Sequence, residues 1–332
     1  MVAVTQSAPA PFDALDPDAV FAAAESIGLE PSGRLFALNS YENRVYQLGD
    51  EQGDLWVLKF YRPARWSDAA IAEEHAFTFE LAAAELPVAA PLVRDGRSLF
   101  VDAKLRFAAF PYLAGRAPEL DDAATLSLLG RTLARMHAVG TRARFAHRPV
   151  LTLARLGEQS RAQVIAAGFV PDALAEQYAR VSEQVIGRVR QCFDNFGPLP
   201  RLRIHGDCHI GNILWRENGP LFVDLDDCMS GPRIQDLWMF LAGDAASQQA
   251  TWAALMEGYE MFAEFDYAEL TLVEALRSLR ILHHAAWIAN RWRDPAFPRA
   301  FPWFGDARFW ERHISDLFEQ LAAMDDPPIL SR

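Results

Sequence analysis

The chain has 332 residues, enough for two domains or two lobes, each with an apolar core of its own. Its composition, 51% apolar and 23% charged, is typical of a folded globular protein and excludes the disordered and membrane-embedded classes. The formal net charge of -12 argues against broad electrostatic attraction to nucleic acid or to an anionic membrane, and it leaves a cationic substrate possible.

The cysteine content indicates a reducing compartment. The three cysteines, Cys192, Cys208 and Cys228, are few and odd in number and show no CxxC spacing, so we expect a cytoplasmic protein without a disulfide framework. The N-terminal stretch lacks a basic start and an unbroken apolar core, which predicts no secretion signal. No apolar run approaches the roughly 18 to 20 residues that a membrane span requires.

The first third of the chain predicts a small, mostly antiparallel, nucleotide-binding sheet with one helix, preceded by a short helical segment. A short helical pattern occupies residues 16–27, and residues 42–50 and 55–63 alternate with period two, as in a β-hairpin. Residues 67–85 have apolar positions at helical spacing, and Ser67 is a suitable N-cap. Two or three further short strands follow within residues 87–116. These elements define a predicted N-terminal lobe.

The remainder of the chain predicts a helical lobe with one exception. Long amphipathic helical patterns begin after Gly115, so we place the lobes at residues 1–113 and 114–332. The exception is residues 201–228, where the segments NILW and LFVDL form a hairpin that we expect to turn at Asn218-Gly219. The predicted class is therefore α+β: a two-lobed, protein-kinase-like fold with a sheet lobe and a mainly helical lobe.

The polar residues around this hairpin predict phosphoryl-transfer chemistry. Asn212 follows Asp207 by five residues, and Asp224 follows twelve residues later at the end of the second strand. Phosphoryl transfer needs a carboxylate that orients and deprotonates a hydroxyl, plus oxygen ligands that hold Mg²⁺ against the phosphates of ATP. The first spacing alone fits a capped turn equally well. Combined with the hairpin and the upstream sheet, it predicts Asp207 and Asp224 as catalytic residues and Asn212 and Asp224 as Mg²⁺ ligands.

A lysine in the predicted sheet completes the nucleotide site. Lys59 has apolar strand neighbours, so its charge must be paired or must face a polar cleft. Glu74 falls on the following helix, flanks its apolar stripe and is the preferred partner, and Glu73 is the competing choice. Such a pair would hold the lysine against the nucleotide phosphates.

Three further features leave alternatives open. The expected phosphate-covering loop has no glycine, and Ser40, with Asn43 second, is its candidate nucleotide contact, although a plain polar turn fits almost as well. Asp236 is expected to begin or stabilise a helix under the catalytic loop. The pair His283-His284 and several tryptophans are expected to pack in the core, their alternative being to line the acceptor site.

The motif HGDCHIGN followed by FVDLDD resembles the phosphotransferase superfamily of aminoglycoside and choline kinases. Longer stretches spanning roughly residues 38–304 are similar to the bacterial stress response kinase A family: LNSYENRVYQ, VLKFYRPARW, EEH, PVAAP, HRP, RIHGDCHIGNILWR, GPRIQDLWM and RWRDPAFPRAFPWF. The resemblance implies a cytoplasmic, monomeric, Mg²⁺- and ATP-dependent serine/threonine protein kinase of the stress response. On matching positions Asp207 would accept the proton, Asn212 and Asp224 would bind Mg²⁺, and Ser40 would contact the nucleotide.

Two other functions remain open at this stage. A small-molecule kinase of the aminoglycoside, choline or homoserine type would use the same chemistry on a different acceptor, and a cationic acceptor would be attracted by the acidic chain. An inactive nucleotide-binding scaffold would act through a partner, but such a protein needs no catalytic base.

Overall fold

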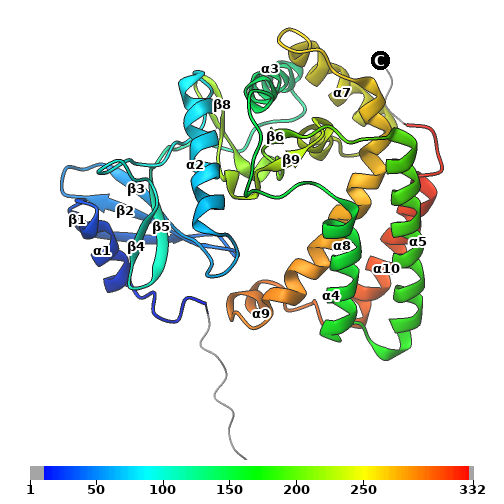
Figure 1. Cartoon of the computed structure of the whole chain (residues 1–332), viewed down its shortest axis with the longest axis horizontal. Coiled ribbons are helices and arrows are strands. Elements are labelled where there is room, and N and C mark those ends of the chain that lie inside the picture. The colour runs from blue at the N-terminus through cyan, green and yellow to red at the C-terminus, as the bar shows by residue number, and fades with distance from the viewer. Residues whose placement is uncertain (1–10, 329–332) are drawn as a thin grey trace, which may run out of the picture.

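The computed structural model describes residues 11–328, and its two lobes confirm the predicted α+β, kinase-like architecture. Figure 1 shows the sheet lobe on one side and the helical lobe on the other. Helix α1 (Pro17–Ser26) begins the described part, and its N-cap Asp16 accepts a hydrogen bond from the Ala19 amide at 2.8 Å. The predicted helix over residues 16–27 is therefore confirmed.

The N-terminal sheet has five antiparallel strands in the order β1-β2-β3-β5-β4. Their bounds are β1 (Pro31–Leu38), β2 (Arg44–Asp50), β3 (Leu55–Phe60), β4 (Phe100–Asp102) and β5 (Leu105–Pro111). The register pairs Lys59 with Val45 on one side and Ala108 on the other. The lysine therefore lies on the central strand, where the sheet fixes its position. One face of the sheet packs on α1 around Val20, Leu58 and Phe107.

Helix α2 (Asp68–Ala83) connects the two lobes. Ser67 caps it by accepting a hydrogen bond from the Ala70 amide at 3.1 Å, which confirms the predicted helix start. Phe77 and Leu81 on its buried face belong to the core of the C-terminal lobe. Figure 1 shows the helix between the sheet and that lobe. A side chain on α2 is therefore held in place from both sides.

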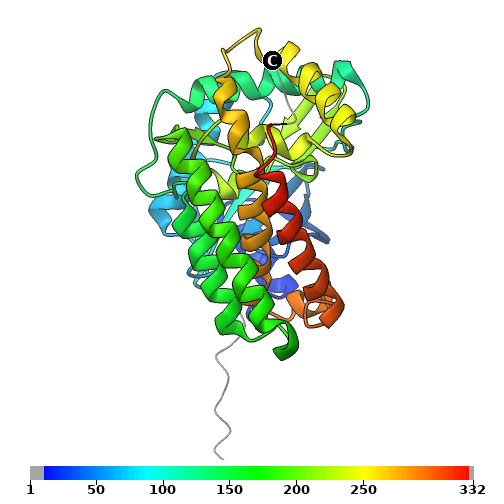
Figure 2. The same cartoon turned by 90° about the vertical axis from the view of Figure 1, so that its right-hand side faces the viewer.

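The C-terminal lobe is built from helices around a large apolar core. Their bounds are α3 (Ala123–Gly140), α4 (Gln159–Ala167), α5 (Asp172–Phe196), α6 (Ile234–Leu237), α7 (Ala245–Tyr259), α8 (Val273–Arg291), α9 (Ala296–Ala300) and α10 (Ala307–Ala323). Helices α4, α5, α8 and α10 lie side by side, as Figure 2 shows. Among residues 11–328, no helix combines the length and apolarity needed to cross a membrane.

Two short antiparallel pairs frame the loop that carries the predicted catalytic motif. Strand β6 (Leu202–Ile204) pairs with β9 (Met229–Gly231), and β7 (Ile213–Arg216) pairs with β8 (Gly219–Phe222). The predicted hairpin exists, but its predicted turn is wrong by one residue, because Gly219 pairs with Arg216 and already belongs to β8. The turn is made by Glu217 and Asn218.

Candidate active site

The loop over residues 205–212 is anchored from below by a buried carboxylate. Asp236, on α6, accepts hydrogen bonds from the backbone amides of His205 and Gly206, both at 2.8 Å. Gly206 has a φ of 85°, and a Cβ there would collide with the carbonyl of Asp227, so the turn requires glycine. Asp236 is expected from the sequence to begin or stabilise the helix under the loop. It lies inside α6, whose N-cap is Arg233, and its carboxylate instead binds the amides of the loop.

Asp207 projects from this loop with its carboxylate held by two basic side chains. Arg280 of α8 donates to Oδ1, and His209 Nε2 lies 3.4 Å from Oδ2. Burial alone would raise the pKa of Asp207, but the hydrogen bond with His209 and the charge of Arg280 outweigh it, and that pKa lies well below its ordinary value. The side chain is 27% exposed, so a carboxylate anion faces solvent at this point.

The structure brings Asn212 and Asp224 to the same edge of the hairpin. Asn212 Nδ2 donates to the backbone carbonyl of Asp207 at 3.0 Å, which orients the amide. Its own carbonyl accepts the Val223 amide at 3.0 Å, so Asn212 lies beside the residue that precedes Asp224. Asp224 has a φ of 58°, a left-handed conformation that costs a non-glycine residue about 1–3 kcal/mol and is common at functional sites.

Lys59 reaches from the sheet lobe to this edge. Its Nζ lies 2.9 Å from Asp224, 3.4 Å from Asp226 and 3.4 Å from Glu74. Burial alone would lower the pKa of Lys59, but the three carboxylates outweigh it and hold that pKa well above its ordinary value. The chain has only two lysines, and the other, Lys104, lies exposed in the turn between β4 and β5.

The two candidate glutamates have different surroundings. Glu74 is buried, contacts Lys59, and accepts a hydrogen bond from the Tyr61 hydroxyl at 3.3 Å. Burial raises the pKa of Glu74 above its ordinary value, against the opposing charge of Lys59. The Glu73 carboxylate instead accepts three backbone amides of residues 146–148, at 2.7 to 2.8 Å. Glu74 is the one that joins the lysine.

The loop between β1 and β2 contributes Asn43 more directly than Ser40. Asn43 is buried, its Nδ2 donates to Asp226 at 3.1 Å, and its Oδ1 accepts the Arg62 amide at 3.1 Å. Ser40 lies half-buried in the turn itself. The structure therefore connects Asn43 to Asp226, one of the carboxylates around Lys59.

The site contains three further residues, Asp226, Arg65 and Arg148, that the sequence motifs did not predict. Asp226 is buried and is paired with Lys59 and with Arg65, which also contacts Asp227 at 2.6 Å. Arg148 donates to the carbonyls of Asp226 and Cys228 and lies over the Trp66 ring. The only signal for the two arginines was their occurrence in VLKFYRPARW and HRP, two of the stretches that carried the resemblance.

The sequence comparisons agree with this geometry. Residues 35–273 match the phosphotransferase enzyme family. Stress response kinase A of Escherichia coli strain K12 is 42% identical over 318 residues, which is 96% of either chain. The chain belongs to the stress response kinase A family. A relative with the same identity and coverage is the serine/threonine protein kinase RdoA of Salmonella typhimurium strain LT2, at 42% over 96% of each chain.

Solved structures show the same fold at low sequence identity. Amicoumacin kinase in complex with AMP-PNP and Ca²⁺ superimposes with a TM-score of 0.74, at 19% identity and 95% coverage of both chains. A microcompartment-associated aminopropanol kinase gives a TM-score of 0.68, at 20% identity over 92% of this chain and 100% of the other. This member of the stress response kinase A family is therefore a phosphotransferase, and ATP and a divalent metal ion are the co-substrate and cofactor expected of it.

The donor set fits a divalent cation that also binds phosphate. In the described residues no three His, Cys, Asp or Glu side chains gather into a metal site by themselves. Asn212 and Asp224 can supply two hard oxygen ligands, and the Nδ2 bond of Asn212 leaves its Oδ1 available. A cation there would complete its shell with phosphate and water oxygens, which is how Mg²⁺ is usually held.

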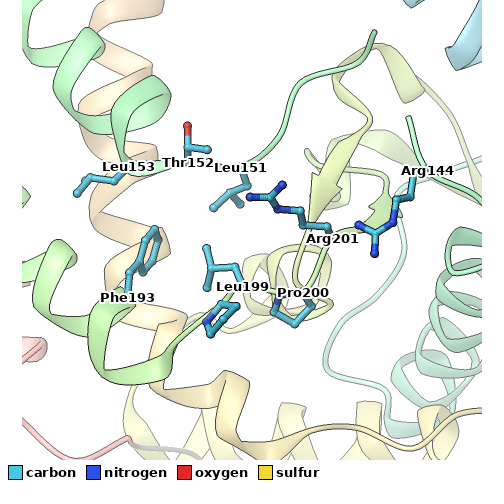
Figure 3. A pocket seen from close by; sticks show the side chains of 9 residues that line it. Arg144, Leu151, Thr152, Leu153, Phe193, Leu199, Pro200 and Arg201 are labelled. Carbon is cyan, nitrogen blue, oxygen red and sulfur yellow. The ribbon is translucent and has the colours of Figure 1, made fainter. Parts of the chain in front are cut away.

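Two of the hollows on the helical lobe, within residues 11–328, differ in their relation to the site. One, of about 420 Å³, is lined by His209 and Arg280, both of which contact Asp207. The larger, of about 520 Å³, lies around Leu151, Phe193 and Leu199 with Arg144 and Arg201 beside it (Figure 3). The larger hollow shares no lining residue with the catalytic loop, so only the smaller one adjoins the candidate site.

Proposed function

We propose that the chain is an ATP-dependent serine/threonine protein kinase in which Asp207 is the catalytic base. The observation that carries the proposal is the position of Lys59, which joins Glu74 of the sheet lobe to Asp224 of the helical lobe at 3.4 and 2.9 Å. A buried ammonium shared between the lobes marks where nucleotide phosphates would bind. The serine/threonine specificity is supported by the name of the Salmonella typhimurium relative.

In this mechanism each residue acts on one bond or one charge. The oxygen of the acceptor hydroxyl bonds to the γ-phosphorus of ATP, while the bond from that phosphorus to the β-γ bridging oxygen breaks and ADP leaves. Asp207 orients the hydroxyl and takes its proton. Lys59, held by Glu74, would contact the α- and β-phosphates, and Ser40 would contact the nucleotide from the first loop. Asn212 and Asp224 would hold Mg²⁺, which would supply positive charge against the phosphate oxygens.

Several finer assignments belong to the same proposal. The lobes divide at residues 113 and 114, the protein works as a cytoplasmic monomer, and its physiological role lies in a stress response. The names of the curated relatives support the stress role. The scarcity of cysteine supports a reducing compartment. A small-molecule kinase and an inactive scaffold are the alternatives that the experiment below separates.

The test is phosphoryl transfer from labelled ATP in Mg²⁺ to the protein itself, to protein acceptors and to small hydroxyl compounds. Asp207→Asn should lower kcat by about 10²- to 10⁴-fold while the fold is retained, because only the base is lost. Asp224→Asn should also weaken Mg²⁺-dependent ATP binding. Asp18→Asn, an exposed carboxylate on α1, is the matched control and should change neither property.

Each outcome distinguishes one function. Label on serine or threonine that disappears with Asp207→Asn supports the protein kinase. Transfer to small hydroxyl compounds alone would move the assignment to a small-molecule kinase. ATP binding without turnover on any acceptor would leave the scaffold.

A further inference from the structure

The hollow of about 420 Å³ lies directly beside the candidate base. Its wall includes two basic and two aromatic side chains from α8 and α10 together with one carboxylate: Arg277, Arg280, His284, Phe309 and Asp316. Arg280 links the hollow to the base, since its guanidinium contacts the Asp207 carboxylate while the side chain remains 44% exposed. If the hydroxyl of an acceptor approached Asp207, the groups next to that hydroxyl on the acceptor would therefore contact Arg280.

The lining of the hollow contains more guanidinium groups than carboxylates, and the two carboxylates that pair with these arginines lie at its edge. The protein has a formal net charge of -12, yet the hollow presents two guanidinium groups and one carboxylate, Asp316. Glu274 partly balances Arg277 at 3.0 Å, and Arg277 also lies over the Trp238 ring. Arg280 has Asp207 as its partner. The guanidinium of Arg280 would repel a cationic group on the acceptor and attract an anionic one.

The contact between Arg280 and Asp207 gives this charge a catalytic consequence. A carboxylate oxygen that already accepts from a guanidinium has fewer lone pairs for an incoming hydroxyl. An anion on the acceptor offers Arg280 a second partner of the same kind. If the carboxylate of the acceptor replaced that of Asp207 as the partner of Arg280, the arginine would stay paired and an oxygen of Asp207 would become available.

We propose that this hollow is the acceptor subsite and that Arg280 selects acceptors carrying a carboxylate or phosphate next to the reacting hydroxyl. The proposal rests on the proposed function and specifies its substrate class. For a protein acceptor, the class is a serine or threonine flanked by acidic residues. The same chemistry excludes the cationic amino alcohols and aminoglycosides that the acidity of the chain as a whole would favour.

The test compares short peptides that are identical except for the residues flanking one central serine: glutamate, glutamine or lysine. Wild-type protein should phosphorylate the glutamate peptide with a kcat/KM about tenfold above that of the lysine peptide, the usual size of one exposed charge effect near a site. D-Glycerate and ethanolamine serve as anionic and cationic small acceptors, and they distinguish a small-molecule source of the anion from a peptide.

Variants assign the preference to Arg280. Arg280→Gln should bring the ratio between the two peptides close to one, and Arg280→Lys should keep most of it. Arg180→Gln, an exposed arginine on α5, should leave the ratio unchanged. An equal loss on all peptides with Arg280→Gln, or a wild-type preference for lysine, would overturn the proposal and leave Arg280 as a residue that only positions Asp207.

A binding experiment separates this proposal from the proposed function. Peptides with alanine in place of the serine cannot accept phosphate, and fluorescence anisotropy measures their affinity directly. Tighter binding of the glutamate version, lost in Arg280→Gln, supports the subsite even if no peptide is phosphorylated. Equal binding of both versions would refute it even if the protein proves to be a protein kinase.

Discussion

His75 is a buried titratable side chain next to Tyr61, whose hydroxyl also contacts Glu74, the partner of Lys59. Its Nε2 lies 2.8 Å from the Tyr61 hydroxyl and its Nδ1 lies 2.8 Å from Ser98 Oγ. Burial lowers the pKa of His75 to about 3, and the Lys59 ammonium contributes in the same direction. The imidazole is therefore neutral in the folded protein near pH 7, and adding a proton to it opposes folding.

The sign of this effect gives a pH prediction. Between pH 3 and 6.5 the unfolded chain protonates His75 and the folded chain does not, so this residue makes stability rise with pH in that window. His75→Gln should reduce the slope of the free energy of unfolding between pH 4.5 and 6 by about 1 kcal/mol per pH unit. Denaturant titrations at several pH values measure it.

The control for this prediction is His147→Gln. His147 lies on the exposed segment after α3, and its replacement removes a histidine without opening the buried surroundings of His75. An identical slope in His75→Gln and wild type would mean that His75 is accessible to protons in the folded state.

At the scale of elements, the crossing of α3 and α7 depends on two glycines. A Cβ at Gly130 would collide with the Leu255 carbonyl, and one at Gly258 would collide with the Ser127 carbonyl. The two helices therefore approach at backbone distance. Because β6 packs beside α3, this contact also supports the strand that leads into the catalytic loop.

Gly258→Ala should lower the free energy of unfolding by about 2–3 kcal/mol, since the backbone must move apart to admit the methyl group. The matched control is Gly187→Ala in the middle of α5, where a Cβ meets nothing within 4 Å. That change should stabilise by about 0.5–1 kcal/mol, because alanine is the better helix former. Thermal and urea unfolding of both variants measure the difference, and equal effects would show that the helices do not pack this closely.

The sequence could predict the elements whose determinants lie close together along the chain. The helix over residues 67–85 has its cap and its apolar stripe in consecutive residues, and the structure ends it within two residues of the expected bound. The hairpin turn was misplaced because Asn218-Gly219 is a strong local turn signal. Gly219 has a φ of 110°, which favours glycine, but it adopts this conformation as the first residue of β8 and not as the second residue of the turn.

The residues of the candidate site also fall into two groups, those that are close in sequence and those that only the fold brings together. Asp207, Asn212 and Asp224 lie within one segment, so their spacing could be interpreted directly. Arg280 meets Asp207 only because α8 folds back onto the loop from 73 residues away. No local pattern indicates such a partner, and an arginine on an amphipathic helix is usually a solvated residue.

At the scale of the whole molecule, the loop between β1 and β2 in the sheet lobe is bound to the helical lobe by hydrogen bonds and ion pairs. Glu42 accepts a hydrogen bond from Trp287 at 2.5 Å and pairs with Arg62 at 3.0 Å and Arg291 at 3.1 Å. Asp294, after α8, accepts Arg44 and Arg62, both at 2.7 Å. These two carboxylates therefore fix the relative position of the lobes through arginines of both.

Asp294→Asn should lower the free energy of unfolding by about 3 kcal/mol, because two arginines lose a buried counter-charge. It should also lower the affinity for ATP, since the lobes then align less firmly. Calorimetry and nucleotide titration measure the two effects. Asp68→Asn, which removes a 73% exposed partner of Arg106, is the matched control and should cost less than about 1 kcal/mol. Equal losses in the two variants would contradict a structural role for the interlobe contacts.

The scarcity of lysine makes the protein a natural target for amine-directed labelling. Lys104 is exposed in its turn and offers a free amine to an acylating reagent, whereas Lys59 is enclosed by three carboxylates. Peptide mapping by mass spectrometry then compares one reactive and one protected site within the same molecule. The modification of Lys59 relative to Lys104 then reports how often Lys59 separates from its three carboxylate partners, and no engineered probe is needed.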